Sequence, residues 1–148
     1  MVRNFKVLCS LALLLSALPL IASEDPIEAR QELMEGARDG VKAIGAMLKR
    51  ETPFDSDEAM NGLQAMQKAA NEAGELFPEG SETGHDTEAK STVWTDREGF
   101  DQELADFAVN VEAAIAANPQ NLDTLNTVMK PIFKNCKSCH EGYRVEKD

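Results

Sequence analysis

Near its C-terminus the chain carries two cysteines and a histidine in the order Cys136-Lys137-Ser138-Cys139-His140. The pattern Cys-x-x-Cys-His is the attachment signature of c-type haem. Residues three apart on a helix share a face, so both thiols can reach the two vinyl groups at one edge of the porphyrin. The imidazole that follows is a good ligand for haem iron. The motif therefore predicts one covalently attached haem c with its iron, held by Cys136 and Cys139, with His140 as an iron ligand.

Two other uses of this motif fit the sequence less well. A structural zinc site needs about four ligands, and outside the motif only Cys9 and His85 could add a Cys or His donor. A thioredoxin-like redox pair belongs in a βαβ context, and no strand pattern surrounds these cysteines. His85 itself lies in a polar stretch, where we expect a surface histidine rather than a ligand.

The N-terminus predicts a secretory signal peptide. Arg3 and Lys6 form a short basic region before the almost wholly apolar stretch 7–21, and the small residues Ala22 and Ser23 offer a cleavage site. The apolar stretch is shorter than the roughly 20 residues of a spanning helix, so we expect no stable membrane anchor. Export to the periplasm follows from this prediction.

Cleavage would divide the chain into a signal peptide, residues 1–23, and a mature chain, residues 24–148. The mature chain is long enough for one domain around one core. The formal net charge of the full chain is −11, and loss of Arg3 and Lys6 makes it more negative by two. Nucleic acid and anionic lipid are therefore poor partners. Aromatic residues make up only 5% of the chain, and a buried porphyrin would supply apolar volume that rings usually fill.

Apolar residues at spacings of three and four predict four amphipathic helices. Helices of about 20 to 25 residues with short links after the first and the third favour antiparallel neighbours. We therefore expect an all-α, up-down-up-down four-helix bundle, with haem in its core near the end of the last helix. The residues expected to face the core are Ile27, Arg30, Met34, Ala37, Val41, Ile44 and Leu48; Ala59, Leu63, Met66, Ala70, Ala73 and Phe77; Phe100, Leu104, Phe107, Val111 and Ala114; and Leu122, Leu125, Met129, Ile132, Cys136, Cys139 and Tyr143.

Local signals set the expected helix ends. Asp55 and Thr95 are each followed three residues later by glutamate, which predicts a capping box at the start of the second and the third helix. Residues 78–94 are rich in Gly, Ser, Thr, Glu and Asp and predict a long connection. Pro131 is expected to kink the last helix or to mark its effective start.

Two residues near the start of the first helix are candidates for contact with the haem. Arg30 is the one charged residue on an otherwise apolar face, and burying an unpaired charge costs several kcal/mol. A haem propionate is its expected partner, unless the side chain reaches water at the helix start. Met34 follows one turn later, and its thioether can coordinate haem iron. The alternative is a core methionine that fills a gap, as the other methionines of the predicted helices would.

At the level of whole motifs, the chain resembles the class II cytochromes c, the cytochrome c′ family. The resemblance covers the whole mature chain. It rests on Arg30-Gln31-x-x-Met34 near the start, on Phe77-Pro78-Glu79-Gly80, on Val93-Trp94-Thr95-Asp96, and above all on Cys136-Lys-Ser-Cys139-His140-Glu-Gly-Tyr143-Arg144 at the end.

The resemblance implies further roles for single residues. His140 would be the proximal iron ligand, and Arg144 would flank it. Arg30 and Gln31 match positions that contact the haem propionate region. Glu88 falls at a loop position that approaches the haem in relatives. Each of these roles is a prediction about haem binding, and those of Gln31, Glu88 and Arg144 rest on the resemblance alone.

The resemblance places Met34 at the distal position, which divides the family. In cytochrome c′ proper this residue is usually apolar and the iron stays five-coordinate, open to small gases. In the low-spin relatives a methionine binds the iron and the protein passes electrons, although some five-coordinate members also carry methionine here.

Two functions are therefore open for this chain. The first is a periplasmic one-electron carrier that meets redox partner proteins, with His140 and Met34 as axial ligands. The second is a haem protein that binds nitric oxide or carbon monoxide. A peroxidase-like enzyme ranks last because no second histidine or polar group is placed for acid–base work, so we expect no enzymatic activity. The sequence leaves a homodimer open.

Overall fold

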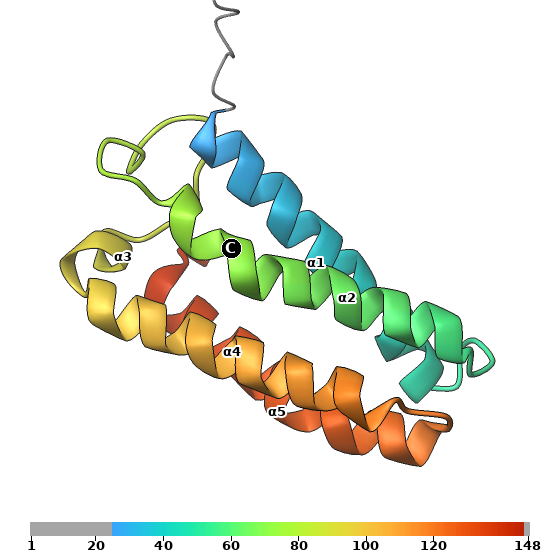
Figure 1. The fold of residues 1–148 in the computed structure, drawn as a ribbon. Coiled ribbons are helices and arrows are strands. Elements are labelled where there is room, and N and C mark those ends of the chain that lie inside the picture. The colour runs from blue at the N-terminus through green and yellow to red at the C-terminus, as the bar shows by residue number, and fades with distance from the viewer. Residues whose placement is uncertain (1–24, 147–148) are drawn as a thin grey trace, which may run out of the picture.

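The computed structural model describes residues 25–146 and confirms an all-α four-helix bundle (Figure 1). The predicted signal peptide lies outside the described residues. The elements are α1 (Pro26–Leu48), α2 (Ser56–Glu72), a 3-10 turn (Ala73–Leu76), α3 (Thr92–Thr95), α4 (Arg97–Ala117) and α5 (Leu122–Tyr143). Among these described helices, none combines the length and the apolar character needed to cross a membrane.

Side-chain caps begin all four long helices, and one of the predicted caps is misplaced. Asp55 accepts hydrogen bonds from the backbone N–H groups of residues 57 and 58 and starts α2, as expected. The start of α4 is capped by Asp96, which accepts from Gly99 N, and not by Thr95. Thr95 is instead the last residue of α3, because the backbone N–H of Asp96 turns back to the carbonyl of Thr92.

Helix α5 begins earlier than one reading of Pro131 suggested. It starts at Leu122, where the side chain of Asn121 accepts a hydrogen bond from Thr124 N, and it continues through the proline to Tyr143. Pro131 is therefore not the start of the helix. The side chain of Pro131 is exposed.

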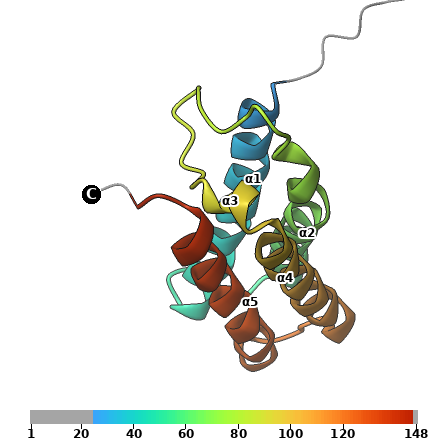
Figure 2. The ribbon, with the colours of Figure 1, turned by 90° about the vertical axis from the view of Figure 1, so that its left-hand side faces the viewer.

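The four long helices associate as two antiparallel pairs (Figure 2). Helix α1 packs mainly on α2 and helix α4 mainly on α5, while contacts between α2 and α4 join the pairs. Direct contact between α1 and α5 is much weaker. The side of the bundle formed by α1 and α5 is thus the one that the chain itself closes least.

The predicted core of helices α2, α4 and α5 is largely confirmed, and on α1 the predicted Ile27, Arg30, Ala37 and Ile44 are buried. The other three predicted positions of α1 are each off by one residue: Leu33, Gly40 and Met47 are buried, whereas Met34, Val41 and Leu48 are only half-buried. The reason is that α1 packs on α2 through the face that carries Leu33. The face that carries Met34, with Val41 seven residues and Leu48 fourteen residues later, lies beside it and packs at the edge of the core.

Close approach of two glycines fixes how α1 crosses α2. A Cβ atom added at Gly40 would lie 2.8 Å from both Cα and the carbonyl oxygen of Gly62. Backbone atoms cannot move aside as a flexible side chain can, so the two helices touch here only because neither residue has a side chain.

This contact predicts that Gly40→Ala destabilises the protein. We expect the free energy of unfolding to fall by about 1–3 kcal/mol, because the new methyl group forces the two helices apart. Gly45→Ala on the same helix is the matched control, since a Cβ there meets nothing within 4 Å. That control should stabilise the protein by roughly 0.5–1 kcal/mol through helix propensity. Thermal unfolding followed by circular dichroism measures both, and equal shifts for the two variants would contradict the prediction.

Candidate haem site

The two cysteines of the motif lie on the last turns of α5, at the edge of the core. Both are free thiols, half-buried, and packed against the buried cluster. Burial raises the pKa of both thiols, and for Cys139 burial together with the nearby Glu103 carboxylate and Cys136 raises it to about 11. Both sulfurs are therefore held neutral, in apolar surroundings that suit thioether bonds to a porphyrin.

His140 follows on the next position of the helix and is also half-buried. Burial lowers its pKa, the positive charge of Arg144 lowers it further, and Glu88 acts in the opposite direction. The imidazole is thus favoured in its neutral form, which is the form that can coordinate iron. Glu88 and Arg144, both expected near the haem, are accordingly brought together around His140.

The end of α5 is held by the loop that connects α2 to α3. The backbone of residues 88–90 pairs with that of residues 143–145: Lys90 N donates to Tyr143 O at 2.9 Å and Val145 N donates to Glu88 O at 2.7 Å. Two side chains bind the last carbonyls of the helix, since Lys90 Nζ donates to Glu141 O and the Thr92 hydroxyl to Gly142 O. Free carbonyls at a helix end need such partners, and here these bonds fix the turn that carries His140.

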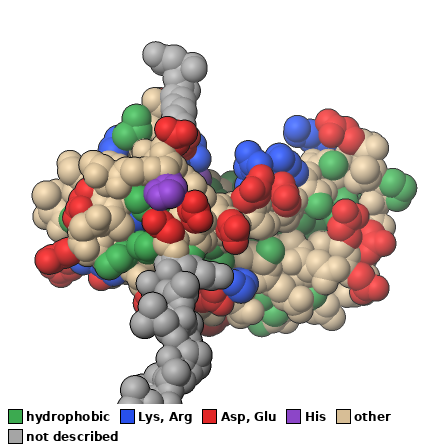
Figure 3. Space-filling model, turned by 90° about the horizontal axis from the view of Figure 1, so that it is seen from above, with side chains coloured by type: hydrophobic (Ala, Val, Ile, Leu, Met, Phe, Trp, Pro, Cys, Tyr) green, Lys and Arg blue, Asp and Glu red, His purple; other side chains and the backbone are tan. Residues whose placement is uncertain are grey.

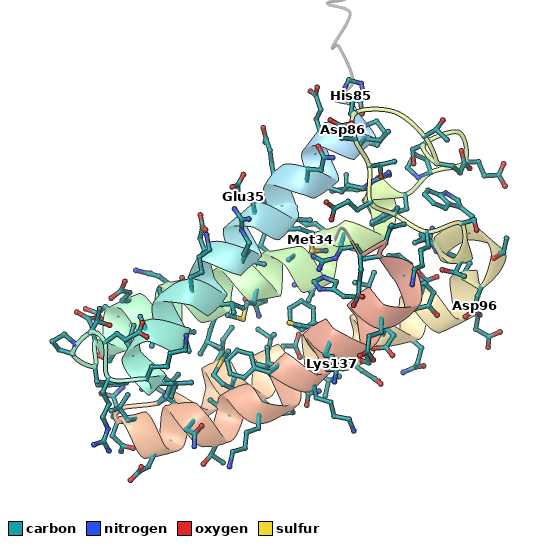
Figure 4. The ribbon with its side chains drawn as sticks, turned by 180° about the vertical axis from the view of Figure 1, so that it is seen from behind. Met34, Glu35, His85, Asp86, Asp96 and Lys137 are labelled. Carbon is teal, nitrogen blue, oxygen red and sulfur yellow. The ribbon has the colours of Figure 1, made fainter. Side chains whose placement is uncertain are left out.

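Met34 lies on the side of α1 that faces α5 (Figure 4). Its side chain is half-buried and packs against the core. On this side of the molecule the surface is hollowed, between the end of the described chain and a group of basic side chains (Figure 3). The placement of Met34 opposite the helix that carries His140 is compatible with the predicted distal position.

Arg30 is buried, with only 4% of its surface exposed, and its terminal nitrogens find neutral partners within the protein. Nη1 donates to Leu76 O and to the Ser81 hydroxyl, and Nη2 donates to Ser81 O and to the Thr87 hydroxyl. The alternative, in which the side chain reaches water at the helix start, is therefore wrong. Neutral oxygens, and not an anion, accept these four hydrogen bonds, and the expected contact with a haem propionate stays a prediction.

Polar contacts of three further side chains, those of Gln31, His85 and Trp94, also hold the connection between α2 and α3 in place. Gln31 Nε2 donates to His85 O at 2.9 Å. His85 is exposed, as expected, and its two ring nitrogens face Asp25 at 3.3 Å and Glu28 at 3.2 Å. Trp94 Nε1 donates to Pro78 O. The propionate contact expected for Gln31 remains a prediction.

The residues around the motif fit a porphyrin. Phe133 lies three residues before Cys136 and seven before His140, on one face of α5. It exposes 36% of its surface, and it is the only aromatic residue among the exposed large apolar residues of the described chain. A porphyrin bonded to Cys136 and Cys139 would cover such a ring. The donor set, two thiols three residues apart and a neutral imidazole, matches haem c, and the half-buried Met34 can serve as a second ligand.

A zinc site is not supported by the side chains around the motif. Within residues 25–146, no three or more His, Cys, Asp or Glu side chains lie together in a way that could hold a metal ion. Glu103, the carboxylate that helps to raise the pKa of Cys139, accepts a hydrogen bond of 2.7 Å from the Ser138 hydroxyl.

Three polar residues at or near the site were not predicted. Ser81 and Thr87 are the hydroxyl partners of Arg30, and Glu103 lies on α4 beside the motif. All three occur in segments whose polar composition predicts exposure, so no signal in the sequence distinguishes them. Helix packing alone brings them to the site.

Tyr143, one turn after Cys139, ties the end of α5 to the start of α4. Its hydroxyl donates to Asp96 Oδ2 at 2.8 Å, and its ring meets Phe100 edge to face with centroids 5.3 Å apart. Partial burial and the negatively charged Asp96 raise the pKa of Tyr143 to about 12. Gly99 leaves room for this bond, since a Cβ there would collide with both the hydroxyl and the carboxylate.

Comparison with known proteins agrees with this site. The family model described as Cytochrome C' matches residues 25–144. Cytochrome c-556 of Rhodopseudomonas palustris is 32% identical over 137 residues, covering 90% of this chain and 91% of the relative. Cytochrome c' of the same organism is 34% identical and covers 86% of each chain. The solved structure of a cytochrome c' from Rhodopseudomonas palustris superposes with a TM-score of 0.80 at 32% identity, covering 85% of this chain and all of the other.

The chain therefore belongs to the cytochrome c′ family, the class II c-type cytochromes. Its prosthetic group is haem c, attached covalently. Relatives named cytochrome c-556, c-554 and c' all occur at similar identity. Membership alone thus leaves open which branch of the family this chain represents.

The Tyr143–Asp96 bond predicts an unusually late ionisation of the phenol. Tyr143 is the only tyrosine in the chain, so the tyrosinate absorbance near 295 nm, taken as a difference spectrum against neutral pH, reports this residue alone. We expect a midpoint at about pH 12. Asp96→Asn removes the negative charge and should move the midpoint down towards the ordinary value near 10. A midpoint near 10 in the parent protein would show that the bond does not persist in solution.

Proposed function

We propose that this chain is an exported one-electron carrier, with His140 and Met34 as the axial ligands of its haem iron. The observation that carries the proposal is the position of Met34: half-buried on α1, on the side that faces the helix of Cys136, Cys139 and His140. The haem supplies an iron that alternates between the ferric and the ferrous state. The relatives named cytochrome c-556 and c-554 are consistent with this assignment.

The side chains around the haem would hold the iron and its ligands in fixed positions during electron transfer. Cys136 and Cys139 would hold the porphyrin edge, and neutral His140 would bind from one side because its turn is fixed by Lys90, Thr92 and the 88–90 backbone. Methionine as the second ligand raises the reduction potential. A site whose ligands hardly move loses little energy to reorganisation when the electron arrives.

The alternative is a five-coordinate haem protein that binds nitric oxide or carbon monoxide. One observation favours it: a relative at 34% identity is named cytochrome c'. In that case Met34 would only pack beside an open iron. We propose no catalysed reaction for either case, since His85, the second histidine of the described chain, is engaged with Asp25 and Glu28 at the start of α1.

Met34→Leu separates the two functions. The exchange keeps the side-chain volume, so it should cost less than about 1.5 kcal/mol of stability, but it removes the thioether. If Met34 binds iron, the ferric parent is low-spin and binds carbon monoxide slowly after reduction. The variant should then be high-spin, bind carbon monoxide faster and have a lower potential. Optical and electron paramagnetic resonance spectra at neutral pH measure the spin state.

Met66→Leu is the matched control for this experiment. Met66 is fully buried on α2, in the core, and its exchange should leave the spectra unchanged. A high-spin spectrum for the ferric parent protein would overturn ligation by Met34 and favour the gas-binding function.

Export is tested separately. We propose that the chain reaches the periplasm and is cleaved near Ala22 and Ser23, because the first 23 residues have the composition of a signal peptide. Expression in a Gram-negative host with the haem attachment machinery should give a periplasmic protein that begins at Ser23 or Glu24. N-terminal sequencing of that fraction decides, and a chain that still begins with Met1 would contradict the proposal.

A further inference from the structure

We propose that Arg30 is a positioning residue. Through the loop of residues 77–91, it holds the start of α1, and with it Met34, at a fixed place relative to the end of α5 that carries His140. Arg30 lies one turn before Met34 on α1. The inference concerns a connection inside the protein, and its consequence for iron coordination rests on the proposed function.

The first half of the connection joins α1 to the loop. Arg30 is 4% exposed, and its guanidinium donates four hydrogen bonds, three of them to Ser81 and Thr87 of the loop and one to Leu76 O just before it. Its carbon Cζ lies 4.5 Å from the ring centroid of Phe77 and 5.8 Å from that of Trp94. Such a group cannot leave its partners without burying unpaired N–H groups, which is costly.

The second half joins the loop to α5, and Thr87 is the point where both halves meet. The Thr87 hydroxyl accepts from Arg30 Nη2 at 2.7 Å and from Ala89 N at 3.3 Å. Ala89 pairs across to Arg144, and the flanking residues bond through Lys90 N to Tyr143 O and Val145 N to Glu88 O. A continuous series of contacts therefore runs from Arg30 to the turn that ends α5.

This route matters because α1 and α5 hardly touch directly. Their mutual contact is the weakest among the four neighbouring pairs of long helices. Additional ties hold the loop on α1, from Gln31 to His85 O and from His85 to Asp25 and Glu28. These ties are on exposed side chains, whereas Arg30 is buried, so Arg30 is expected to provide the stiffest part of the connection.

The functional consequence concerns the sixth ligand of the iron. A methionine sulfur remains on haem iron only if its helix is held at the right distance from the proximal histidine. With α1 fastened to the loop and the loop fastened to α5, Met34 and His140 belong to one rigid unit. Loosening Arg30 would release the first turns of α1 and let the sulfur move away from the iron.

The test uses Arg30→Lys in the haem-loaded protein. Lysine keeps the positive charge but cannot make the four hydrogen bonds of the planar guanidinium. Two measurements are made. The first is amide hydrogen exchange of Lys90, whose N–H donates to Tyr143 O, and of Val145, whose N–H donates to Glu88 O; both residues lie far from residue 30 in sequence. The second is the ferric spin state with the rate of carbon monoxide binding.

We expect exchange at Lys90 and Val145 to accelerate by about tenfold or more, because the loop opens locally more often. We also expect a growing high-spin fraction and faster binding of carbon monoxide. Arg38→Lys is the matched control: Arg38 is on the same helix but exposed, paired only with Glu35 at 2.7 Å, and its exchange should change neither measurement. Thr87→Val, which removes one acceptor and keeps the side-chain shape, should shift both in the same direction, and it replaces Arg30→Lys if that variant does not fold.

Unchanged exchange at Lys90 and Val145 in both Arg30→Lys and Thr87→Val overturns the proposal. A changed spin state or rate of carbon monoxide binding with unchanged exchange also overturns it, and indicates instead that Arg30 acts directly on the haem. If the parent protein is high-spin, the proposed ligation by Met34 fails. The exchange measurement still decides the present inference, since faster exchange supports the connection and unchanged exchange refutes it.

Discussion

A charged guanidinium buried among aromatic rings imposes the strictest demand in this structure. Arg30 has lost almost all its contact with water, and burial lowers its pKa despite the opposing influence of Asp25 and Glu82. A buried charge without hydrogen bonds would cost several kcal/mol. The protein meets this demand with neutral carbonyl and hydroxyl oxygens of Leu76 and of the 77–91 loop. These hydrogen bonds give the polar 77–91 loop, which contains no long helix, a defined backbone path.

The path of this loop connects the two helices, α1 and α5, that lie on either side of the candidate haem site. The bundle closes tightly where α1 meets α2, through Gly40 and Gly62, and where α4 meets α5. It closes least between α1 and α5, which is where a porphyrin attached to Cys136 and Cys139 can be inserted between His140 and Met34. The loop crosses this weakly joined side, bonding to α1 at one end and to the end of α5 at the other. A bundle that leaves room for a flat ring between two helices needs some other connection between them, and the loop provides it.

The electrostatics of the motif follow from the same packing. The two thiols and the imidazole lie half-buried on the edge of the core, and burial pushes each towards its neutral form. Arg144 and Glu88, brought to His140 by the pairing of the loop with residues 143–145, shift its pKa in opposite directions. The local charge around His140 is therefore set by two residues that are more than fifty positions apart in the sequence.

The sequence by itself determined the features that depend on local spacing. The Cys136-x-x-Cys139-His140 motif identifies its chemistry because covalent attachment requires that spacing, and the four helices follow from apolar residues at every third and fourth position. Asp55 was recognised as a cap because its signal is local. The predicted cap of α4 is misplaced by one residue, because aspartate is at least as favourable as threonine at an N-cap and only the turn of α3 selects Asp96 over Thr95.

Only the tertiary structure decided which helix or loop packs against each face of α1. On α1 the sequence could not distinguish the stripe of Leu33 and Met47 from that of Met34 and Leu48, because both are apolar at helical spacing. The contact of Gly40 with Gly62 decided that the first stripe faces α2 and left Met34 on the side of α5. The partners of Arg30 were equally hidden, since hydroxyl and carbonyl oxygens occur throughout any polar loop and carry no mark in the sequence. They become partners because packing places the loop over a buried charge that must be satisfied.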